Sequence, residues 1–264
     1  VSCSVKHKKT FDYIFNKTEA ITLEQSKLTL SKDITVLSFS DSSMVDRNSS
    51  IIKVDSGWIV YSKNSESSIL SFTSDGQFSG YIGHRGNGPG EYTSVYDVVV
   101  NQKSKVLEVL SDGGIFCYTF GGDFLDKKEV TYPAFSFAID DRQNYWFYVG
   151  NNTTYGDAKM ICTDENIANV AYYLHQKSNM LPMVENNFGR NGEWLTFHES
   201  LNHDLYTIEN GKLDLSYAID FPNYKLPKKL HELSGMEVIE ELQRSNYASI
   251  INLSLIHISE PTRH

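Results

Sequence analysis

A glycine-rich stretch, residues 81–92 with the sequence YIGHRGNGPGEY, combines residue types and spacing that could form a functional loop. Glycines in series let backbone N–H groups approach a bound anion, so such a loop could hold a phosphate. A P-loop requires GxxxxGK[ST] before a helix, and a dinucleotide-binding loop requires GxGxxG at the start of one. Here the glycine spacing differs, no Lys-Ser or Lys-Thr follows, and the next segment has the pattern of a strand. The sequence therefore disfavours phosphate binding.

The same stretch can be interpreted as a link between two structural units. Glycine admits unusual backbone angles and proline stiffens the chain, which suits a link of this kind. The residues expected to shape it are Gly83, Gly86, Gly88, Pro89 and Gly90. The side chains that could contact a ligand are His84, Arg85, Glu91 and Tyr92. Tyr92 could also anchor the next unit by packing, and we expect the structural role of the stretch to dominate.

Several aspartates could carry acid–base chemistry or bind a cation. Asp140 and Asp141 are adjacent, but neighbouring side chains at a strand end point apart, so a hairpin turn explains them better. Asp55, Asp97 and Asp140 flank expected inner strands and could ring one face of a channel. The more ordinary role of aspartate at a strand end is to cap the turn.

The remaining candidates for chemistry are weaker. His198 and His203 flank a predicted turn and are expected to be surface imidazoles. Cys117 and Cys162 lie in apolar, strand-like runs and are expected to be buried thiols rather than a disulfide or a metal pair. The sequence contains no CxxC, HxxxH or GxSxG pattern, so neither zinc nor a serine nucleophile has support. We expect no catalytic residue, no metal and no cofactor.

Composition narrows the classes of partner. The chain has 264 residues and a formal net charge of −9, with 40% hydrophobic and 12% aromatic residues. This is enough for a packed core, and the many tyrosines and phenylalanines favour strands. Nucleic-acid binding would need a concentrated basic face, which the sequence lacks. No stretch approaches the roughly 20 apolar residues of a membrane-spanning helix.

The N-terminal residues indicate export. Val1-Ser2-Cys3-Ser4 resembles the end of a bacterial lipobox, in which the cysteine is lipidated after cleavage. The polar segment that follows would serve as a tether, and residues 1–33 are assigned to this tether and lead-in. We therefore expect an exported lipoprotein, periplasmic or at the cell surface, whose only membrane contact is a lipid anchor at Cys3. A chance cysteine near the end of the chain is the alternative.

A repeat positions all of these residues. Thr73, Thr119, Thr163 and Thr207 each close a short apolar run, at spacings of 46, 44 and 44 residues. Turn-rich stretches such as Ser-Asp-Gly, Gly-Gly and Asn-Gly follow them and suit tight hairpins. The three tryptophans, at positions 58, 146 and 194, begin apolar runs at the same place in their units.

Each unit thus contains three or four short strands with a period near 45 residues. That period is typical of a β-propeller blade of four antiparallel strands. Helical solenoids are excluded because no unit has a 3.6-residue apolar period. An all-β partial propeller is therefore predicted over residues 34–222. It consists of an N-terminal strand at 34–39 and four blades, approximately 47–92, 93–133, 134–182 and 183–222.

The stretch from Gly83 to Tyr92, followed by Asp97-Val-Val-Val100, resembles the six-bladed β-propeller family common in gut Bacteroidota. It is also similar to the broader NHL-type repeat, in which a glycine-rich link ends one blade and an aromatic residue begins the next. The resemblance covers residues 10–252 and implies six blades, of which four are present here. It also implies export, often as a lipoprotein. It supplies a fold more than a function.

The pattern changes after residue 222. Residues 228–247 are charged and have apolar residues at helical spacing, so 223–252 is assigned to a surface helix and the approach to a missing fifth blade. Residues 253–263, LSLIHISEPTR, resemble the translation of a sequencing adaptor. We therefore expect a truncated chain and exclude residues 253–264 from functional reasoning.

Three functions remain open. The first is an exported, non-enzymatic propeller that binds an unidentified ligand or protein partner on one face, such as a glycan, peptide or protein. The second is a propeller hydrolase or lyase with a metal in the axial channel. The third is a structural module of a cell-surface complex. The scarcity of metal-type spacing favours the binding protein.

Overall fold

The computed structural model describes residues 10–11, 35–39, 49–63, 68–150, 156–175, 186–191, 194–219, 225–233 and 235–244. Within these ranges the chain folds into four antiparallel sheets of four consecutive strands, one of which gains a fifth strand. Cys3 and residues 245–264 lie outside the described residues, so the predicted lipid anchor and the C-terminal tail have no structural counterpart here.

Each sheet is one blade, in which the four strands follow one another in sequence. The strands of blade 1 are β2 (Ser50–Val54), β3 (Gly57–Tyr61), β4 (Ile69–Thr73) and β5 (Phe78–Ile82). Those of blade 2 are β8 (Asp97–Asn101), β9 (Val106–Ser111), β10 (Gly114–Tyr118) and β11 (Phe124–Glu129). Those of blade 3 are β12 (Ser136–Ile139), β13 (Tyr145–Tyr148), β14 (Ala158–Thr163) and β15 (Ala171–His175). Those of blade 4 are β16 (Phe188–Asn191), β17 (Trp194–Phe197), β18 (Asp204–Glu209) and β19 (Lys212–Ile219).

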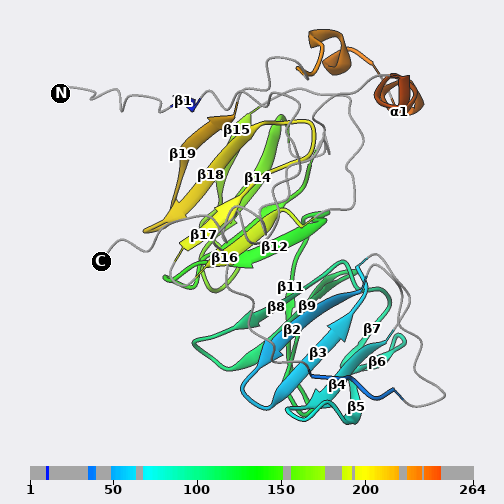
Figure 1. The fold of residues 1–264 in the computed structure, drawn as a ribbon. Coiled ribbons are helices and arrows are strands. Elements are labelled where there is room, and N and C mark those ends of the chain that lie inside the picture. Colours follow the sequence, from blue (N-terminus) through cyan, green and yellow to red (C-terminus); the bar gives the residue numbers. More distant parts are fainter. Residues whose placement is uncertain are drawn as a thin grey trace, which may run out of the picture.

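The blades form a propeller arrangement, with blades 1 and 2 in the lower part of Figure 1 and blades 3 and 4 in the upper part. The first strands of successive blades approach one another, since β12 contacts both β8 and β16. The prediction of an all-β propeller of four-stranded antiparallel blades is confirmed, because strand order and pairing direction agree in all four sheets.

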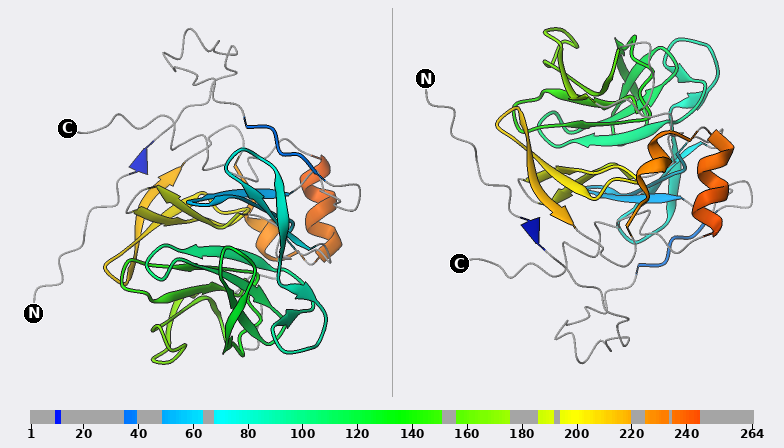
Figure 2. Two further views of the ribbon diagram at one scale, coloured as in Figure 1. Left: turned by 90° about the horizontal axis from the view of Figure 1, so that it is seen from below. Right: turned by 90° about the horizontal axis from the view of Figure 1, so that it is seen from above.

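The segment before blade 1 differs from its prediction. A strand was expected over 34–39, but within 35–39 only Ser38 bridges to Gln77, supported by a 2.8 Å hydrogen bond from Ser38 N to Gly76 O. The strand that does add to a blade is β1 (Thr10–Phe11), which pairs in parallel with β19. Figure 2 shows β1 beside the outer edge of blade 4.

The core is divided among the interfaces between blades. One apolar cluster joins blades 1 and 2 through residues such as Ile59, Tyr92 and Val109. A second joins blades 2 and 3, and a third joins blades 3 and 4. Each blade therefore depends on its neighbours to bury its two faces, as expected for this architecture.

The three tryptophans share a place along the strand but not a common environment. Trp58, Trp146 and Trp194 all lie at the first or second residue of the second strand of a blade. Trp146 is fully buried in the cluster between blades 3 and 4, whereas Trp194 is 59% exposed. Trp58 packs against Phe72 on the face of blade 1 that points away from blade 2.

Consecutive antiparallel strands place their connections alternately at two ends of a blade. We call one end the link face; it carries the links between blades and the turns between second and third strands, such as β9–β10. We call the other end the turn face; it carries the turns between first and second strands and between third and fourth strands. The stretch at 83–92 and residues 130–135 are both on the link face.

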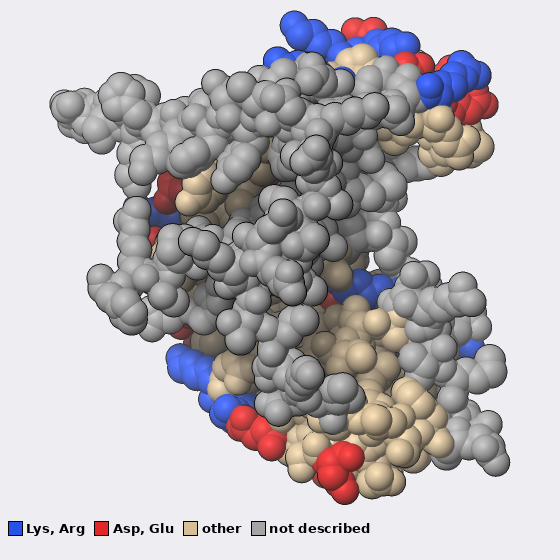
Figure 3. Space-filling view, viewed as in Figure 1, with Lys and Arg blue, Asp and Glu red and all other residues tan. Residues whose placement is uncertain are grey.

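Two short helices follow blade 4, namely η2 (Lys228–His231) and α1 (Gly235–Arg244). Leu230 and Val238 from these helices pack on Leu201, which lies between β17 and β18. The predicted helical segment is therefore present, although it is interrupted. Positive and negative side chains alternate over this region in Figure 3. Among the described residues, no helix is long and apolar enough to cross a membrane.

Candidate functional site

The glycine-rich stretch forms a closed loop on the link face. Its two ends pair as short parallel strands, β6 (His84–Arg85) and β7 (Glu91–Tyr92). Gly86 N donates to Tyr92 O at 3.0 Å, and Glu91 N donates to Gly88 O at 3.0 Å. The Glu91 carboxylate turns back into the loop, where its Oε2 accepts from Gly88 N at 2.8 Å. Three backbone amides, those of Gly86, Gly88 and Glu91, are thus bonded within the loop itself.

Two glycines are required by close contacts within this region. Gly83 has φ +64°, and a Cβ there would lie 2.7 Å from Cζ of the buried Tyr118 ring. A Cβ on Gly86 would lie 1.9 Å from Glu91 Oε2. A side chain at either position would displace a group that is held by its own hydrogen bonds, so the glycines are explained by packing.

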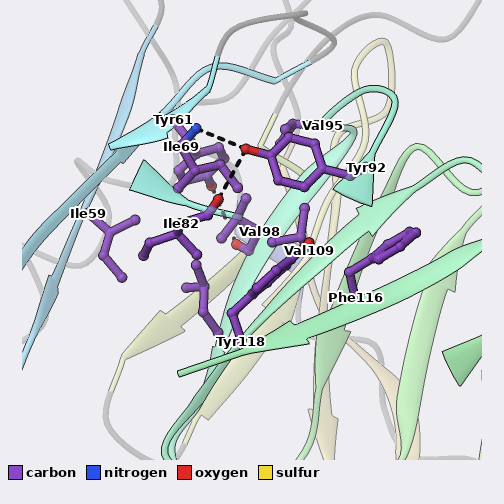
Figure 4. Packing of buried hydrophobic residues seen from close by; sticks show 11 residues of the cluster. Ile59, Tyr61, Ile69, Ile82, Tyr92, Val95, Val98, Val109, Phe116 and Tyr118 are labelled. Atoms are coloured by element: carbon purple, nitrogen blue, oxygen red, sulfur yellow. Dashed lines mark hydrogen bonds between the residues drawn. The ribbon is translucent and has the colours of Figure 1, made fainter. Parts of the chain in front are cut away.

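Tyr92 fastens the loop to blade 1, as Figure 4 shows. Its side chain is 1% exposed, and its hydroxyl donates to Ile82 O at 3.1 Å and accepts from Ile69 N at 3.2 Å. Ile69 and Ile82 are register partners on β4 and β5, so the phenol bridges the end of that strand pair. Burial raises the pKa of the Tyr92 phenol, which therefore stays neutral.

The four side chains considered for ligand contact are therefore in different environments. His84 and Arg85 are exposed, and Arg85 Nε donates to Thr93 O at 3.1 Å. Glu91 is half-buried and bound within the loop, and Tyr92 is in the core. Ligand contact by His84, Arg85 and Glu91 stays a prediction. Tyr92 was expected to anchor the next blade; its hydroxyl bonds to β4 and β5 of blade 1, while its ring lies in the cluster that joins blades 1 and 2.

The three aspartates considered for a carboxylate ring do not form one. Asp97 begins β8, whereas Asp55 and Asp140 follow the ends of β2 and β12, so Asp97 lies at the opposite end of the inner strands. Asp97 is buried and bonded to Lys63 Nζ at 2.8 Å and to Phe137 N at 3.2 Å, which ties blades 1, 2 and 3 together. Among the described residues, no group of three or more His, Cys, Asp or Glu side chains could hold a metal.

Asp140 organises a turn, as its position predicted. Its carboxylate accepts from Arg142 N and Asn144 N at 2.9 Å each, and from Trp146 Nε1 at 3.0 Å. Cys117 and Cys162 are free, buried thiols, which confirms that expectation. Burial, together with the nearby carboxylate of Glu108 for Cys117 and of Asp140 for Cys162, raises the pKa of each thiol to about 12.

His198 corrects another expectation. It was placed on the surface, but its side chain is buried, with 6% relative exposure, at the end of β17. Its backbone N–H donates to Asn187 O at 3.0 Å and its carbonyl accepts from Asn187 Nδ2 at 3.2 Å. Strand β17, which ends just before His198, places this residue inside blade 4. Its polar residue type did not indicate burial.

A residue that the sequence did not single out, Asp112, lies on the link face and lines two cavities there. It lies in the β9–β10 turn, and its Oδ2 accepts from Thr93 Oγ1 at 2.6 Å and from Ser94 Oγ at 3.2 Å. Its Oδ1 accepts from the Tyr96 hydroxyl at 2.5 Å. The carboxylate thus holds the link after the glycine-rich loop against blade 2.

These bonds also fix the charge of the site. Hydrogen bonds from three hydroxyls, chiefly that of Thr93 and also those of Tyr96 and Ser94, hold the pKa of Asp112 below its usual value. The bond to Asp112 in turn raises the pKa of the Tyr96 phenol. At neutral pH the site therefore presents an ionised carboxylate beside a neutral phenol.

Two cavities meet at Asp112. One, of about 380 Å³, lies between the glycine-rich loop and Thr93, Phe116 and Lys127. The other, of about 590 Å³, lies between blade 2 and the link to blade 3 and is lined by residues 96, 110–113 and 130–135, which include Tyr96, Tyr132, Pro133 and Phe135. Both volumes fall in the range of small-ligand sites, and both cavities are lined by blade 2 and by the links that precede and follow it.

A third cavity, of about 800 Å³, lies on the turn face and is lined by residues that include Arg190, Trp194 and Tyr217. It opens beside the face of blade 4 that carries Trp194. On the corresponding face of blade 3, Trp146 is fully buried in the cluster that blades 3 and 4 share. The exposure of Trp194 thus marks a blade face without a neighbouring blade among the described residues, and the link face is the better candidate for a ligand site.

Comparison with known proteins bears on this architecture. The family model that matches residues 6–256 has the description "Domain of unknown function (DUF4934)". The chain belongs to the DUF4934 family. None of the curated proteins matches the sequence of this DUF4934 chain.

Two solved structures resemble the DUF4934 chain. A protein from Bacteroides fragilis, described as a candidate exported protein, has a TM-score of 0.71 at 16% sequence identity, over 81% of this chain and 64% of that one. A member of the DUF4221 family from Bacteroides vulgatus has a TM-score of 0.48 at 10% identity, over 72% of this chain and 62% of that one. The chain thus spans less than two thirds of either protein, and at these identities the first similarity concerns the fold.

Proposed function

We propose that this chain is part of an exported, six-bladed, NHL-like propeller that binds a ligand or protein partner on its link face without catalysing a reaction. The observation that carries the proposal is the pair of cavities that meet at Asp112, between blade 2 and the links on either side of it. The same link face carries the glycine-rich loop, with the exposed His84 and Arg85 at its rim.

A ring with further blades is supported by the exposed face of blade 4. Trp146 is covered by the following blade, and Trp194, at the same place along its strand, is 59% exposed. A fifth blade packed on blade 4 would bury Trp194 in the same way. Export is supported by the fold similarity to the Bacteroides fragilis protein and by the lipobox-like residues around Cys3.

The link face offers a binding surface more clearly than a reaction centre. Its buried phenols are bonded to the backbone, as Tyr92 and Tyr118 illustrate, and its one central carboxylate is held ionised by three hydroxyl groups. A general acid or base would need a pKa near neutrality, and the hydroxyl bonds move that of Asp112 in the opposite direction.

The test is a thermal-shift screen of the protein with a panel of amines, amino acids, oligosaccharides and oligopeptides. A Thr131→Trp variant places a large side chain in the 590 Å³ cavity from an exposed position. Ser74→Trp, in an exposed turn on the turn face, is the matched control. The proposal expects at least one compound whose binding is lost in Thr131→Trp and kept in Ser74→Trp. Compounds that bind both variants equally, or turnover of a compound by the protein, would overturn it.

A further inference from the structure

The 590 Å³ cavity joins an ionised carboxylate to an aromatic wall. Asp112 is exposed at its edge, and Tyr96, Tyr132 and Phe135 are among its lining residues. Because Asp112 is exposed, a cationic group of a ligand can reach its carboxylate and replace water there.

The protein supplies hydroxyl groups for Asp112 but no positive charge. Among the described residues Asp112 accepts three hydrogen bonds, all from neutral hydroxyls, and it forms no ion pair with a lysine, arginine or histidine. Lys127, which lines the adjoining cavity, is paired with Glu129 at 3.1 Å. A carboxylate has about four acceptor positions, so Oδ1, with one bond from Tyr96, can accept again.

The aromatic residues that line the cavity favour a positively charged hydrogen-bond donor. Aromatic faces attract ammonium and guanidinium groups and also pack against the methylene groups that carry them. Tyr132 is held in place by packing on Phe147, with 5.7 Å between ring centroids, and Tyr96 is fixed by its bond to Asp112. Two rings held in place therefore line the same cavity as the carboxylate, and one of them, Tyr96, is bonded to it. The net charge of −9 adds a general attraction for cations.

We infer that this cavity binds the alkylammonium group of a ligand, with the ammonium on Asp112 Oδ1 and its methylene chain along the tyrosine rings. The inference rests on the proposed ligand-binding function of the link face and names the chemistry of its ligand. A lysine side chain in a peptide and a free diamine share this chemistry, and the experiment distinguishes them.

The experiment is isothermal titration of the protein with N-acetyl-lysine methylamide, with cadaverine and with the peptide Ala-Ala-Lys-Ala-Ala. The neutral control ligand is N-acetyl-norleucine methylamide, which keeps the methylene chain and lacks the ammonium. Asp112→Asn removes the charge and keeps one acceptor oxygen, so the hydroxyl or hydroxyls that face the new amide NH2 must turn to accept from it. Asp126→Asn, on the exposed outer strand β11, removes the same charge away from the cavity.

Loss of a charge-assisted hydrogen bond weakens binding by about ten- to a hundred-fold, which is the effect expected for Asp112→Asn. Asp126→Asn is expected to bind like the wild type, and the norleucine compound is expected not to bind the wild type. Tighter binding of the peptide would identify a lysine side chain as the ligand group, and tighter binding of cadaverine a free amine.

Equal affinity of the lysine and norleucine compounds for the wild type would overturn the inference without any variant, as would equal affinity of Asp112→Asn and the wild type. Absence of binding by all three amines would overturn it too. In these cases, a neutral compound that binds the wild type but not Thr131→Trp would still support ligand binding on the link face. The two proposals can therefore fail separately.

Discussion

The hydroxyl of Tyr92 provides the sharpest test of how the glycine-rich loop is held. Tyr92→Phe keeps the buried ring and removes one oxygen, which accepts from Ile69 N and donates to Ile82 O. Leaving a buried donor or acceptor without a partner costs about 1–3 kcal/mol. The two backbone groups are register partners and can partly pair with each other after relaxation, so we expect a loss of about 2 kcal/mol rather than the sum of two full penalties.

Tyr118→Phe is the matched comparison. Its hydroxyl makes a single bond, to Gly90 O at 3.0 Å; Tyr118 is fully buried, but Gly90 is only partly buried. Its removal is expected to cost about 1 kcal/mol, near the ordinary value of one hydrogen bond. Tyr172→Phe, at a site that is 47% exposed, serves as the control without an expected effect.

The assay is urea unfolding followed by circular dichroism, supported by thermal unfolding. For a chain of this size, about 1 kcal/mol lowers the melting temperature by about 2–4 °C, so Tyr92→Phe is expected to fall by about 4–8 °C and Tyr118→Phe by about half as much. The urea slope is expected to stay unchanged, since little surface is altered. A Tyr92→Phe variant no less stable than Tyr118→Phe would refute the proposed anchoring role of the phenol.

Three further outcomes follow from the structure. Gly83→Ala is expected to lower the free energy of unfolding in urea by well over 1 kcal/mol, because it combines a positive φ with a contact on the buried Tyr118 ring. Gly156→Ala, at φ +78° in open space, is the control and is expected to lower it by about 1 kcal/mol. Equal losses in the two variants would argue against the contact at Gly83. Glu199→Gln leaves Lys159, whose side chain is 4% exposed, without its ion-pair partner, so the free energy of unfolding is expected to fall by about 3–5 kcal/mol. Adding Lys159→Met to this variant is expected to recover part of that loss. Purely additive losses from the two substitutions would contradict the pairing. Burial raises the pKa of Tyr61, Tyr118, Tyr145 and Tyr206 above the usual 10.0, so these phenols ionise more readily in the unfolded chain. Their contribution to stability is complete below about pH 10 and is lost as the pH rises further. Reversible ionisation of all 16 tyrosines near pH 10 with the fold intact, followed by phenolate absorbance, would exclude this.

The repeat could be predicted because blades use local signals. Threonines at 46, 44 and 44 residues and glycine-containing turns after the third strands gave the four blades and their strand order, since a meander pairs neighbours in sequence. The segment 34–39 was misassigned because an apolar run of this length is compatible with a strand. Whether such a run joins a sheet depends on an available strand edge with which it can pair. Here, within residues 35–39, only Ser38 forms a bridge, to Gln77.

The candidate site was less predictable because it depends on contacts between segments far apart in sequence. Thr93 and Asp112 are unremarkable by type, and only the fold of blade 2 brings them within 2.6 Å. A signal was present in the Asp-Gly pair at 112–113, which marks a turn, and in the hydroxyl-bearing residues 92–94 and 96 directly after the glycine-rich loop. The glycine-rich loop lies on the same link face as Asp112, while its Glu91 carboxylate and three of its backbone amides bond within the loop.

The most direct test of the central claim, that the link face around Asp112 is the binding site, is hydrogen–deuterium exchange with and without the panel compound that binds most tightly. Slower exchange is expected in three separate segments, residues 93–96, 111–113 and 130–135, which line the cavities at Asp112. Protection confined to residues 190–195 and 207–217, around Trp194 on the turn face, would contradict the claim.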